Sequence, residues 1–215
     1  MIFETDSIEL FYGHKKVLNS VYLKAETGKI TGLLGRNGSG KSSLFHVIFG
    51  HIKAKYSHIK LNNNIYLKPL YTSKNVNYLH QKKLTPNYIT VKNAFNLYGV
   101  DLNLFLEKFP ELSVLTHVKM KRLSGGERRV IEIYLVIMKV ADLVILDEPF
   151  NQLSPIYIEK IEVLLQEQKN KKAIIISDHI FRPILRLSDT VYFLENGNMK
   201  EIKNKKELED LHYFV

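Results

Sequence analysis

One eight-residue segment constrains the fold of this chain more than any other feature: Gly35-Arg36-Asn37-Gly38-Ser39-Gly40-Lys41-Ser42. It has the form G-x-x-x-x-G-K-S/T, whose glycines let the backbone turn sharply so that several N–H groups face inward. An apolar run of strand length, 30–34, precedes it, and a buried-helix pattern follows and stops at Gly50. A glycine turn before a helix is the alternative, but strand, loop and helix in this order predict a phosphate-binding P-loop.

The chemistry of this segment suits a triphosphate and a divalent cation. Lys41 is placed to reach the β- and γ-phosphates, and the Ser42 hydroxyl can supply a ligand to Mg²⁺. The helix that begins here also directs the positive end of its dipole toward the phosphates. We therefore expect the segment to hold the phosphates of a nucleotide.

A later apolar strand ends in a pair of carboxylates. The run Leu143–Leu146 is followed directly by Asp147 and Glu148. A rigidly held carboxylate suits a hard cation bound to phosphates, so Asp147 is the predicted Mg²⁺ partner. Glu148 is the predicted general base, which orients and polarises the attacking water. The alternative is an Asp-Glu-Pro turn that only ends the strand.

A second glycine-containing segment comes before another helix: Leu123-Ser124-Gly125-Gly126-Glu127. It offers a hydroxyl and flexible backbone amides at a helix N-terminus, which is a second potential anion site. Ser124 and Glu127 also have the S-x-x-E spacing of an ordinary capping box, and this alternative stays open. The sequence thus predicts two phosphate-binding surfaces on one chain.

The N-terminal half predicts strands followed by a helical insertion. Strands are expected at 8–12 and 17–25, joined by a turn at 13–16, with a further apolar strand at 76–79. From about residue 82 the pattern becomes helical. In this part, Thr90 and Asp101 are each placed to cap a helix, the second ending near Pro110, and a helix buried on nearly all sides is expected from about Glu127 to Lys139.

The C-terminal half predicts a parallel sheet. The apolar runs 143–146 and 173–176, separated by a helix at 155–168, form a βαβ unit. A last strand at 190–194 is expected to turn at 196–198 into a charged C-terminal helix.

The fold class is therefore α/β. We expect a P-loop nucleoside triphosphatase with a mostly parallel core sheet, an N-terminal antiparallel β subdomain and a helical subdomain that carries LSGGE. Residues 1–215 are expected to form one domain, with 1–81 and 140–215 as the nucleotide-binding core and about 82–139 as the helical subdomain.

Composition narrows the kinds of partner and the cellular location that suit the chain. It holds 31 Lys and Arg against 22 Asp and Glu, a net charge of +9, which favours anionic partners without choosing among them. The absence of cysteine excludes disulfides and thiolate metal sites. The acidic N-terminus lacks the pattern of a secretion signal, and the most apolar stretch, 130–140, is too short to cross a bilayer. We expect a cytoplasmic location, and any role at a membrane requires a separate chain.

The ordered motifs resemble the ATPase subunits of ABC transporters, from about Ile8 to the C-terminus. The motifs that carry this resemblance are Tyr12, GRNGSGKS at 35–42, Gln81, LSGGE at 123–127, LVILDEP at 143–149 and His179. The P-loop and LSGGE in this order are specific, whereas the three single residues gain meaning only from their positions in the series.

The resemblance implies roles for these residues and a substrate, ATP, with Mg²⁺. Tyr12 would stack on adenine, Gln81 would contact Mg²⁺ and relay to the transport partner, and His179 would bind the γ-phosphate. The implied catalytic set is Glu148, His179, Lys41 and Gln81, and the metal ligands are Ser42, Gln81 and Asp147. The implied nucleotide-binding set is Tyr12, Gly35, Arg36, Asn37, Gly38, Ser39, Gly40, Lys41, Ser42, Ser43, Ser124, Gly125, Gly126 and Glu127.

The resemblance also implies partners. Two copies, identical or different, would form a head-to-tail dimer in which LSGGE of one subunit completes the ATP site of the other. The dimer would drive a separate integral-membrane permease from the inner face of the cell membrane, and no nucleic acid partner is expected. A finer resemblance, carried by 126–129, Glu132-Ile133, 147–150 and Asp178-His179, points to the lipopolysaccharide-export and branched-chain amino-acid branches.

The chain departs from the family pattern after the acidic pair. The family commonly has an aspartate that crosses the dimer interface, whereas this chain reads Phe150-Asn151-Gln152-Leu153-Ser154. Ser154 is still expected to cap the next helix, with Pro155 at its first position. The departure puts coupling across the interface in doubt. Ser43 and Arg36 replace the usual threonine and a frequent proline without removing a phosphate ligand.

Two other functions remain open from sequence. A cassette that acts on nucleic acid or the ribosome would suit the positive charge, but the chain has one cassette and no heptad run. A regulatory module that binds ATP without hydrolysing it would suit the substitution at Ser154.

Overall fold

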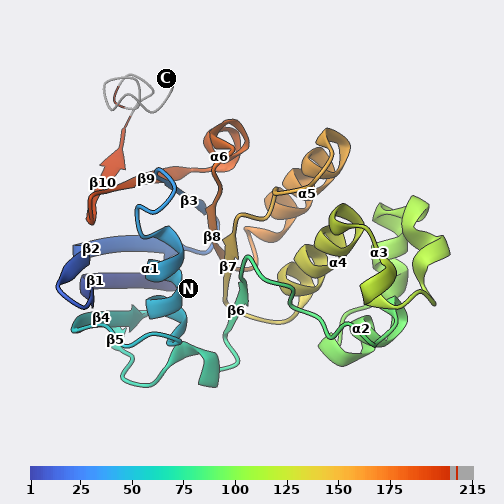
Figure 1. Cartoon of the computed structure of the whole chain (residues 1–215), viewed down its shortest axis with the longest axis horizontal. Coiled ribbons are helices and arrows are strands. Elements are labelled where there is room, and N and C mark those ends of the chain that lie inside the picture. The colour runs from blue at the N-terminus through green and yellow to red at the C-terminus, as the bar shows by residue number, and fades with distance from the viewer. Residues whose placement is uncertain (204–206, 208–215) are drawn as a thin grey trace.

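Two β-sheets form the framework of the computed structural model, which describes residues 1–203 and residue 207 (Figure 1). The antiparallel sheet has the order β2-β1-β4-β5. Its strands are β1 (Ile2–Tyr12), β2 (Lys15–Glu26), β4 (Tyr56–Leu61) and β5 (Asn64–Ile65).

The core sheet has six strands in the order β10-β9-β3-β8-β7-β6, and every neighbouring pair is parallel except β9 with β10. Its strands are β3 (Ile30–Leu34), β6 (Val76–Leu79), β7 (Leu143–Asp147), β8 (Ala173–Ser177), β9 (Thr190–Glu195) and β10 (Asn198–Ile202). The mixed sheet confirms the expected α/β class.

The helices cover both faces of the core sheet. They are α1 (Lys41–Phe49), α2 (Val91–Tyr98), α3 (Leu102–Lys108), α4 (Gly125–Met138), α5 (Pro155–Gln168) and α6 (Phe181–Leu187). Three short 3₁₀ turns lie at Leu70–Thr72, Pro110–Leu115 and Met120–Arg122.

Alternate side chains of the core strands enter two separate hydrophobic cores. Ile145 and Ile175 pack with Phe45 of α1 and with the antiparallel sheet. Val144 and Ile174, on the other face, pack with α4, α5 and α6. Because the side chains of a strand point alternately to its two faces, α1 and α4 lie on opposite faces of the core sheet (Figure 1). This arrangement fixes where the two glycine-containing segments open.

The helical part packs against α4 through aromatic residues. Phe95 of α2 and Phe105 of α3 lie 6.0 and 4.9 Å, centroid to centroid, from the ring of Tyr134. The predicted caps are present, since the Thr90 side chain accepts a hydrogen bond from the Asn93 N–H, 3.2 Å away, and Asp101 accepts one from the next helix. The apolar side chains of the helical part thus join the core that covers one face of the sheet.

Several expected boundaries were wrong, and some elements were not predicted. Lys15 and Lys16 belong to β2 rather than to the turn, and α4 begins at Gly125, two residues before Glu127. β4, β5 and α6 were not anticipated. The strand at 190–194 is not the last, because Asn196 and Gly197, with φ of 49° and 78°, form a tight hairpin turn into β10. The expected C-terminal helix falls mostly outside the described residues.

Two left-handed glycines at helix ends provide a matched test of packing. Gly50 (φ 95°) ends α1 and Gly99 (φ 65°) ends α2. A Cβ at Gly50 would come within 2.9 Å of Pro69 Cα, whereas one at Gly99 would meet open space.

We expect Gly99→Ala to lower the free energy of unfolding by about 1 kcal/mol, the cost of a left-handed alanine. Gly50→Ala should cost about 1–3 kcal/mol more, because the neighbouring backbone must also move. Urea unfolding of both variants measures the difference, and equal losses would contradict the steric account.

Candidate functional site

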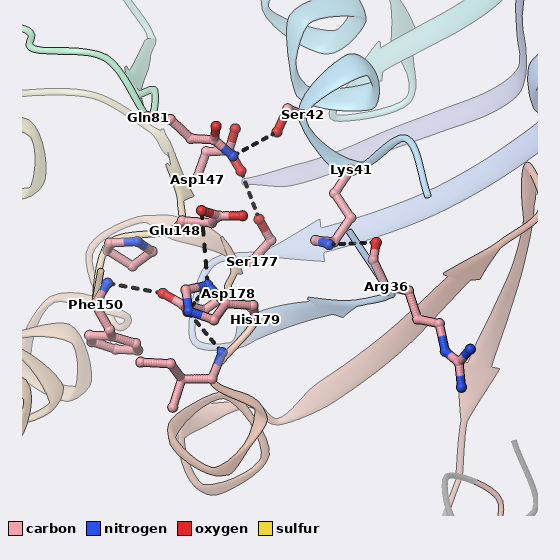
Figure 2. Close-up of polar contacts among 12 residues, drawn as sticks. Arg36, Lys41, Ser42, Gln81, Asp147, Glu148, Phe150, Ser177, Asp178 and His179 are labelled. Carbon is pink, nitrogen blue, oxygen red and sulfur yellow. Dashed lines mark hydrogen bonds and ion pairs between the residues drawn. The ribbon is translucent and has the colours of Figure 1, made fainter. Parts of the chain in front are cut away.

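The P-loop connects the end of β3 to the start of α1, as the sequence predicts. Lys41 is 5% exposed, and its Nζ donates hydrogen bonds to the carbonyls of Gly35, 2.6 Å away, and Arg36, 3.2 Å away. Figure 2 shows the bond to Arg36. Burial lowers the pKa of Lys41, and the carboxylates of Glu148, Asp147 and Asp178 oppose that shift. The ammonium group is thus held inside the loop by carbonyls that a phosphate can replace as partners.

A cavity of about 540 Å³ opens above the loop and joins residues from distant parts of the sequence. Its lining comprises Tyr12, Lys15, Val17, Asn37, Gly38, Gly40, Lys41, Ser42, Ser43, Gln81 and Glu148. Tyr12 is 51% exposed, and its hydroxyl lies 3.3 Å from Ser43 Oγ. One surface therefore carries an exposed aromatic ring, the P-loop and two polar side chains from other strands.

Two predicted metal ligands meet at this cavity, and the third lies buried below. Gln81, just beyond β6, donates from Nε2 to Ser42 Oγ across 3.2 Å. Asp147, 1% exposed at the end of β7, accepts hydrogen bonds at Oδ1 from Ser177 Oγ (3.0 Å) and at Oδ2 from the hydroxyl of Tyr78 (3.4 Å). Burial, reinforced by Asp147, raises the pKa of Tyr78, which keeps that hydroxyl a donor. The carboxylate is thus rigidly oriented.

Glu148 has an unusual backbone conformation. Its φ is 49°, in the left-handed region that side chains with a Cβ disfavour. Its N–H donates to the Ser177 carbonyl of β8 over 2.8 Å. Its Oε2 lies 3.9 Å from Nδ1 of His179, a residue that follows the same strand (Figure 2). The structure therefore brings the predicted base and the predicted histidine together.

Asp178 anchors the segment that carries His179. Its fully buried carboxylate accepts N–H donors from Phe150 (3.0 Å) and Ile180 (2.9 Å), and His179 Nδ1 lies 3.3 Å from Oδ1. Burial raises the pKa of Asp178, and the amide donors and His179 oppose the rise. Asp178 thus ties the loop after β7 to the loop after β8.

The second predicted anion site lies apart from the P-loop cavity. Ser124 Oγ accepts the Glu127 N–H (3.2 Å), and Glu127 Oε2 accepts the Ser124 N–H (2.8 Å), so the capping box is formed. Ser124 and Gly125 are nevertheless exposed to solvent. None of the four residues 124–127 is among those that line the P-loop cavity of their own chain.

The segment 150–154 differs from expectation. Ser154 occupies the N-cap position of α5 and Pro155 follows in its first turn, as expected, but no described residue donates a cap hydrogen bond to the Ser154 side chain. Gln152 is left-handed, with φ of 66°, and a Cβ on Gly125 would collide with its Oε1. A small cavity of about 70 Å³ is bounded by Gln81, Arg129, Glu148, Asn151 and Gln152.

Three residues that border the site were not predicted from the sequence. Asp178 stood beside the predicted histidine but received no role. Lys15 lines the P-loop cavity because the hairpin turn is shorter than expected. Arg129 is a charged residue in a helix expected to be buried, a pattern that indicates a buried partner.

A larger depression of about 760 Å³ lies between the core sheet and the helical part. Aromatic and aliphatic side chains dominate its lining: Phe49, Tyr71, Val76, Tyr78, Leu84, Tyr98, Val136 and Val140, with Lys74, Asn75, Asn77, Gly99 and Lys139. Tyr78 and Leu84 flank the segment that carries Gln81.

The fold and the site together define a P-loop nucleoside triphosphatase. Residues 18–151 match the ABC transporter family. A probable ABC transporter ATP-binding protein of Azorhizobium caulinodans is 31% identical over 87% of this chain and 72% of its own length. The lipopolysaccharide export system ATP-binding protein of Acidithiobacillus ferridurans is 26% identical over 97% and 92%.

A solved nucleotide-free ATP-binding cassette from an ABC transporter is 25% identical, with a TM-score of 0.80 over 100% of this chain and 98% of its own. The chain belongs to the ABC transporter family as an ATP-binding subunit, an ATPase that energises transport. Subunits of this family bind ATP and pair with membrane permeases. Among the described residues, no helix has the length and apolar character needed to cross a bilayer.

Proposed function

We propose that this chain hydrolyses ATP in a site shared between two copies, with each residue in the role that its position suggests. The cavity that joins the P-loop to Gln81 and Glu148 is the observation that carries the proposal. Tyr12 stacks on adenine at the exposed edge. Lys41 and the backbone from Gly35 to Ser43 hold the phosphates at the start of α1.

In this proposal, Glu148 acts as the base. Glu148 borders the cavity, and a hydrogen bond from its backbone N–H to Ser177 of β8 holds the chain that carries it. It accepts the proton of the water that attacks the γ-phosphate. His179, positioned by Asp178 and 3.9 Å from Glu148, donates to the γ-phosphate.

The donor set beside Lys41 suits Mg²⁺. Ser42, Gln81 and Asp147 offer hydroxyl, carboxamide and carboxylate oxygens, the ligands that a hard cation prefers, and two of the three are already in contact. When bound, the cation would neutralise phosphate charge. Asp147 would supply the negative charge of the site.

We further propose that the helical part, about 82–139, carries Ser124, Gly125, Gly126 and Glu127 to the nucleotide of a second copy. The lining of the P-loop cavity supports this proposal, because it includes none of these four residues of the same chain. The segments 1–81 and 140–215 form the nucleotide-binding core. A head-to-tail pair would bring each P-loop against the other copy's α4.

The apolar depression of about 760 Å³ is the proposed docking place of the permease. It lies between the two parts of the chain and is bordered by residues on both sides of Gln81, so an inserted permease segment would contact the strand that carries the metal ligand. Lys74 and Lys139 line it and favour an acidic flank on that segment. The subunit would then sit on the inner face of the cell membrane.

A mixing experiment tests the shared site. Lys41→Met removes the phosphate contact of the P-loop, and Ser124→Arg blocks the start of α4, so each variant alone should lose hydrolysis. In a mixed dimer, one of the two sites combines an intact P-loop with an intact α4. An equal mixture is expected to recover roughly a quarter of the wild-type rate, because half of the dimers then hold one intact site.

The control mixes Lys41→Met with the Lys41→Met/Ser124→Arg double variant, which leaves no intact site in any pair. Melting temperatures check that each variant is folded. Recovery in the control, or none in the test mixture while both variants dimerise, would contradict a site completed in trans.

A further inference from the structure

Arg129 is a buried cation whose hydrogen bonds, within the part of the chain that the structure describes, all go to main-chain oxygens. It lies on α4, five residues after Ser124, and is 9% exposed. Nη1 donates to the His80 carbonyl (3.1 Å), Nη2 to the carbonyls of Asp147 and Glu148 (both 2.8 Å), and Nε to that of Pro149 (3.4 Å). Among the described residues, no carboxylate lies within ion-pair distance of it.

These carbonyls belong to two loops that carry predicted site residues. His80 directly precedes Gln81 beyond β6, and Asp147 to Pro149 span the end of β7, the parallel neighbour of β6. A guanidinium presents its N–H donors in a rigid planar fork, which a flexible ammonium group cannot reproduce. One side chain of α4 therefore fixes the ends of two strands relative to each other.

The contact with Glu148 has a particular consequence. Glu148 is left-handed, and its two backbone polar groups are held from opposite sides: the N–H by Ser177 of β8 and the carbonyl by Arg129. The direction of a side chain follows from the orientation of its backbone. Losing one of these two hydrogen bonds would allow the Glu148 carboxylate to turn away from the cavity.

Arg128, the preceding residue, has a different role. It is 4% exposed and forms an ion pair with Glu132, 3.0 Å from Nε to Oε1. Its other donors reach Thr85 and Asn87, in the segment that enters the helical part, and the carbonyl of Met120. These two adjacent, buried arginines thus bond to separate regions, which provides a matched control.

We propose that Arg129 is a positioning residue that sets the direction of the Glu148 carboxylate and links it to the start of α4. The inference rests on the proposed role of Glu148 as base. Arg129 also borders the small cavity beside Glu148, together with Gln81, Asn151 and Gln152. Any rotation of α4 would pull directly on the carbonyl of Glu148.

The test compares Arg129→Lys with Arg128→Lys, since both keep the charge and lose the planar fork. Arg129→Lys is expected to lower kcat for ATP hydrolysis by about tenfold or more, as a misplaced catalytic group does. The ATP dissociation constant should stay within about threefold, because Arg129 does not line the P-loop cavity. Arg128→Lys should leave kcat nearly unchanged even where it lowers the melting temperature equally.

A double variant separates this inference from the role of Glu148. If Arg129 acts through Glu148, adding Arg129→Lys to Glu148→Gln lowers the rate no further. The inference alone, and not the role of Glu148, is overturned if Arg129→Lys keeps the wild-type kcat while Glu148→Gln is slow. It is also overturned if Arg129→Lys and Arg128→Lys lose kcat and melting temperature to the same extent.

A wild-type rate in Glu148→Gln overturns the proposed base and the inference with it. If the lysine variant does not fold, Arg129→Gln replaces it in every comparison, because it keeps two N–H donors and removes the buried charge.

Discussion

Replacing Glu148 by glutamine is expected to lower kcat for ATP hydrolysis by about 10²- to 10⁴-fold, the contribution of a positioned base. Glutamine keeps the volume of the side chain and its hydrogen-bonding oxygen, but it cannot accept the proton of the attacking water. The left-handed backbone of Glu148 is held by Ser177 and Arg129 through main-chain groups, so the substitution leaves these bonds in place. Phosphate release at saturating ATP measures the effect.

The same variant should retain ATP. Its dissociation constant is expected to stay within about threefold, since an exchange that removes only a base acts on the chemical step. Glu195→Gln, which changes another glutamate at the end of a core strand, is the control and should keep the wild-type rate. Glu148→Gln with more than about a third of the wild-type kcat would contradict general-base catalysis by this residue.

Replacing Lys41 by methionine is expected to weaken ATP binding by about 100-fold or more, because charge-assisted hydrogen bonds to the phosphates are lost from a buried site. Lys41 is 5% exposed and bonded to two loop carbonyls, so its ammonium group is already in place before nucleotide arrives. Methionine fills nearly the same space without the charge. Calorimetric titration with Mg²⁺ and ATP measures the change.

Lys15 supplies the control for this second variant. It lines the same cavity from the hairpin after β1, but its side chain is exposed to solvent. Lys15→Met is expected to change the ATP dissociation constant by no more than about threefold, as for a screened surface charge. If both variants weaken binding equally, the ligand is held by the general positive field of the cavity rather than by the P-loop lysine.

Local patterns made much of the nucleotide site predictable. The strand at Ile30–Leu34, the glycine loop and the helix after Lys41 are contiguous, so their order alone gives their placement. Asp147 and Glu148 follow an apolar run that forms a buried strand, as expected. The contact between Glu148 and His179 could be anticipated only from the resemblance, because it joins the ends of two strands.

The elements and roles that the sequence did not predict depend on tertiary contacts. β4 has exposed or half-exposed side chains throughout and lacks a clear alternation, so its pairing with β1 leaves little trace in the sequence. α6 is only seven residues long, with Pro183 in its first turn, a position that proline tolerates without marking a helix. The role of Arg129 depends on two distant loops that meet at α4, and no spacing in the sequence encodes that meeting.

The placement of α1 and α4 on opposite faces of one sheet bears on how much ATP unassembled subunits hydrolyse in the cell. If α4 of a second copy completes each nucleotide site, as proposed above, a dispersed chain would hydrolyse little ATP, and turnover per copy would rise with the chance of meeting a second copy. A permease that holds two copies side by side would replace that chance with a high effective concentration. Unassembled subunits would then leave cellular ATP untouched.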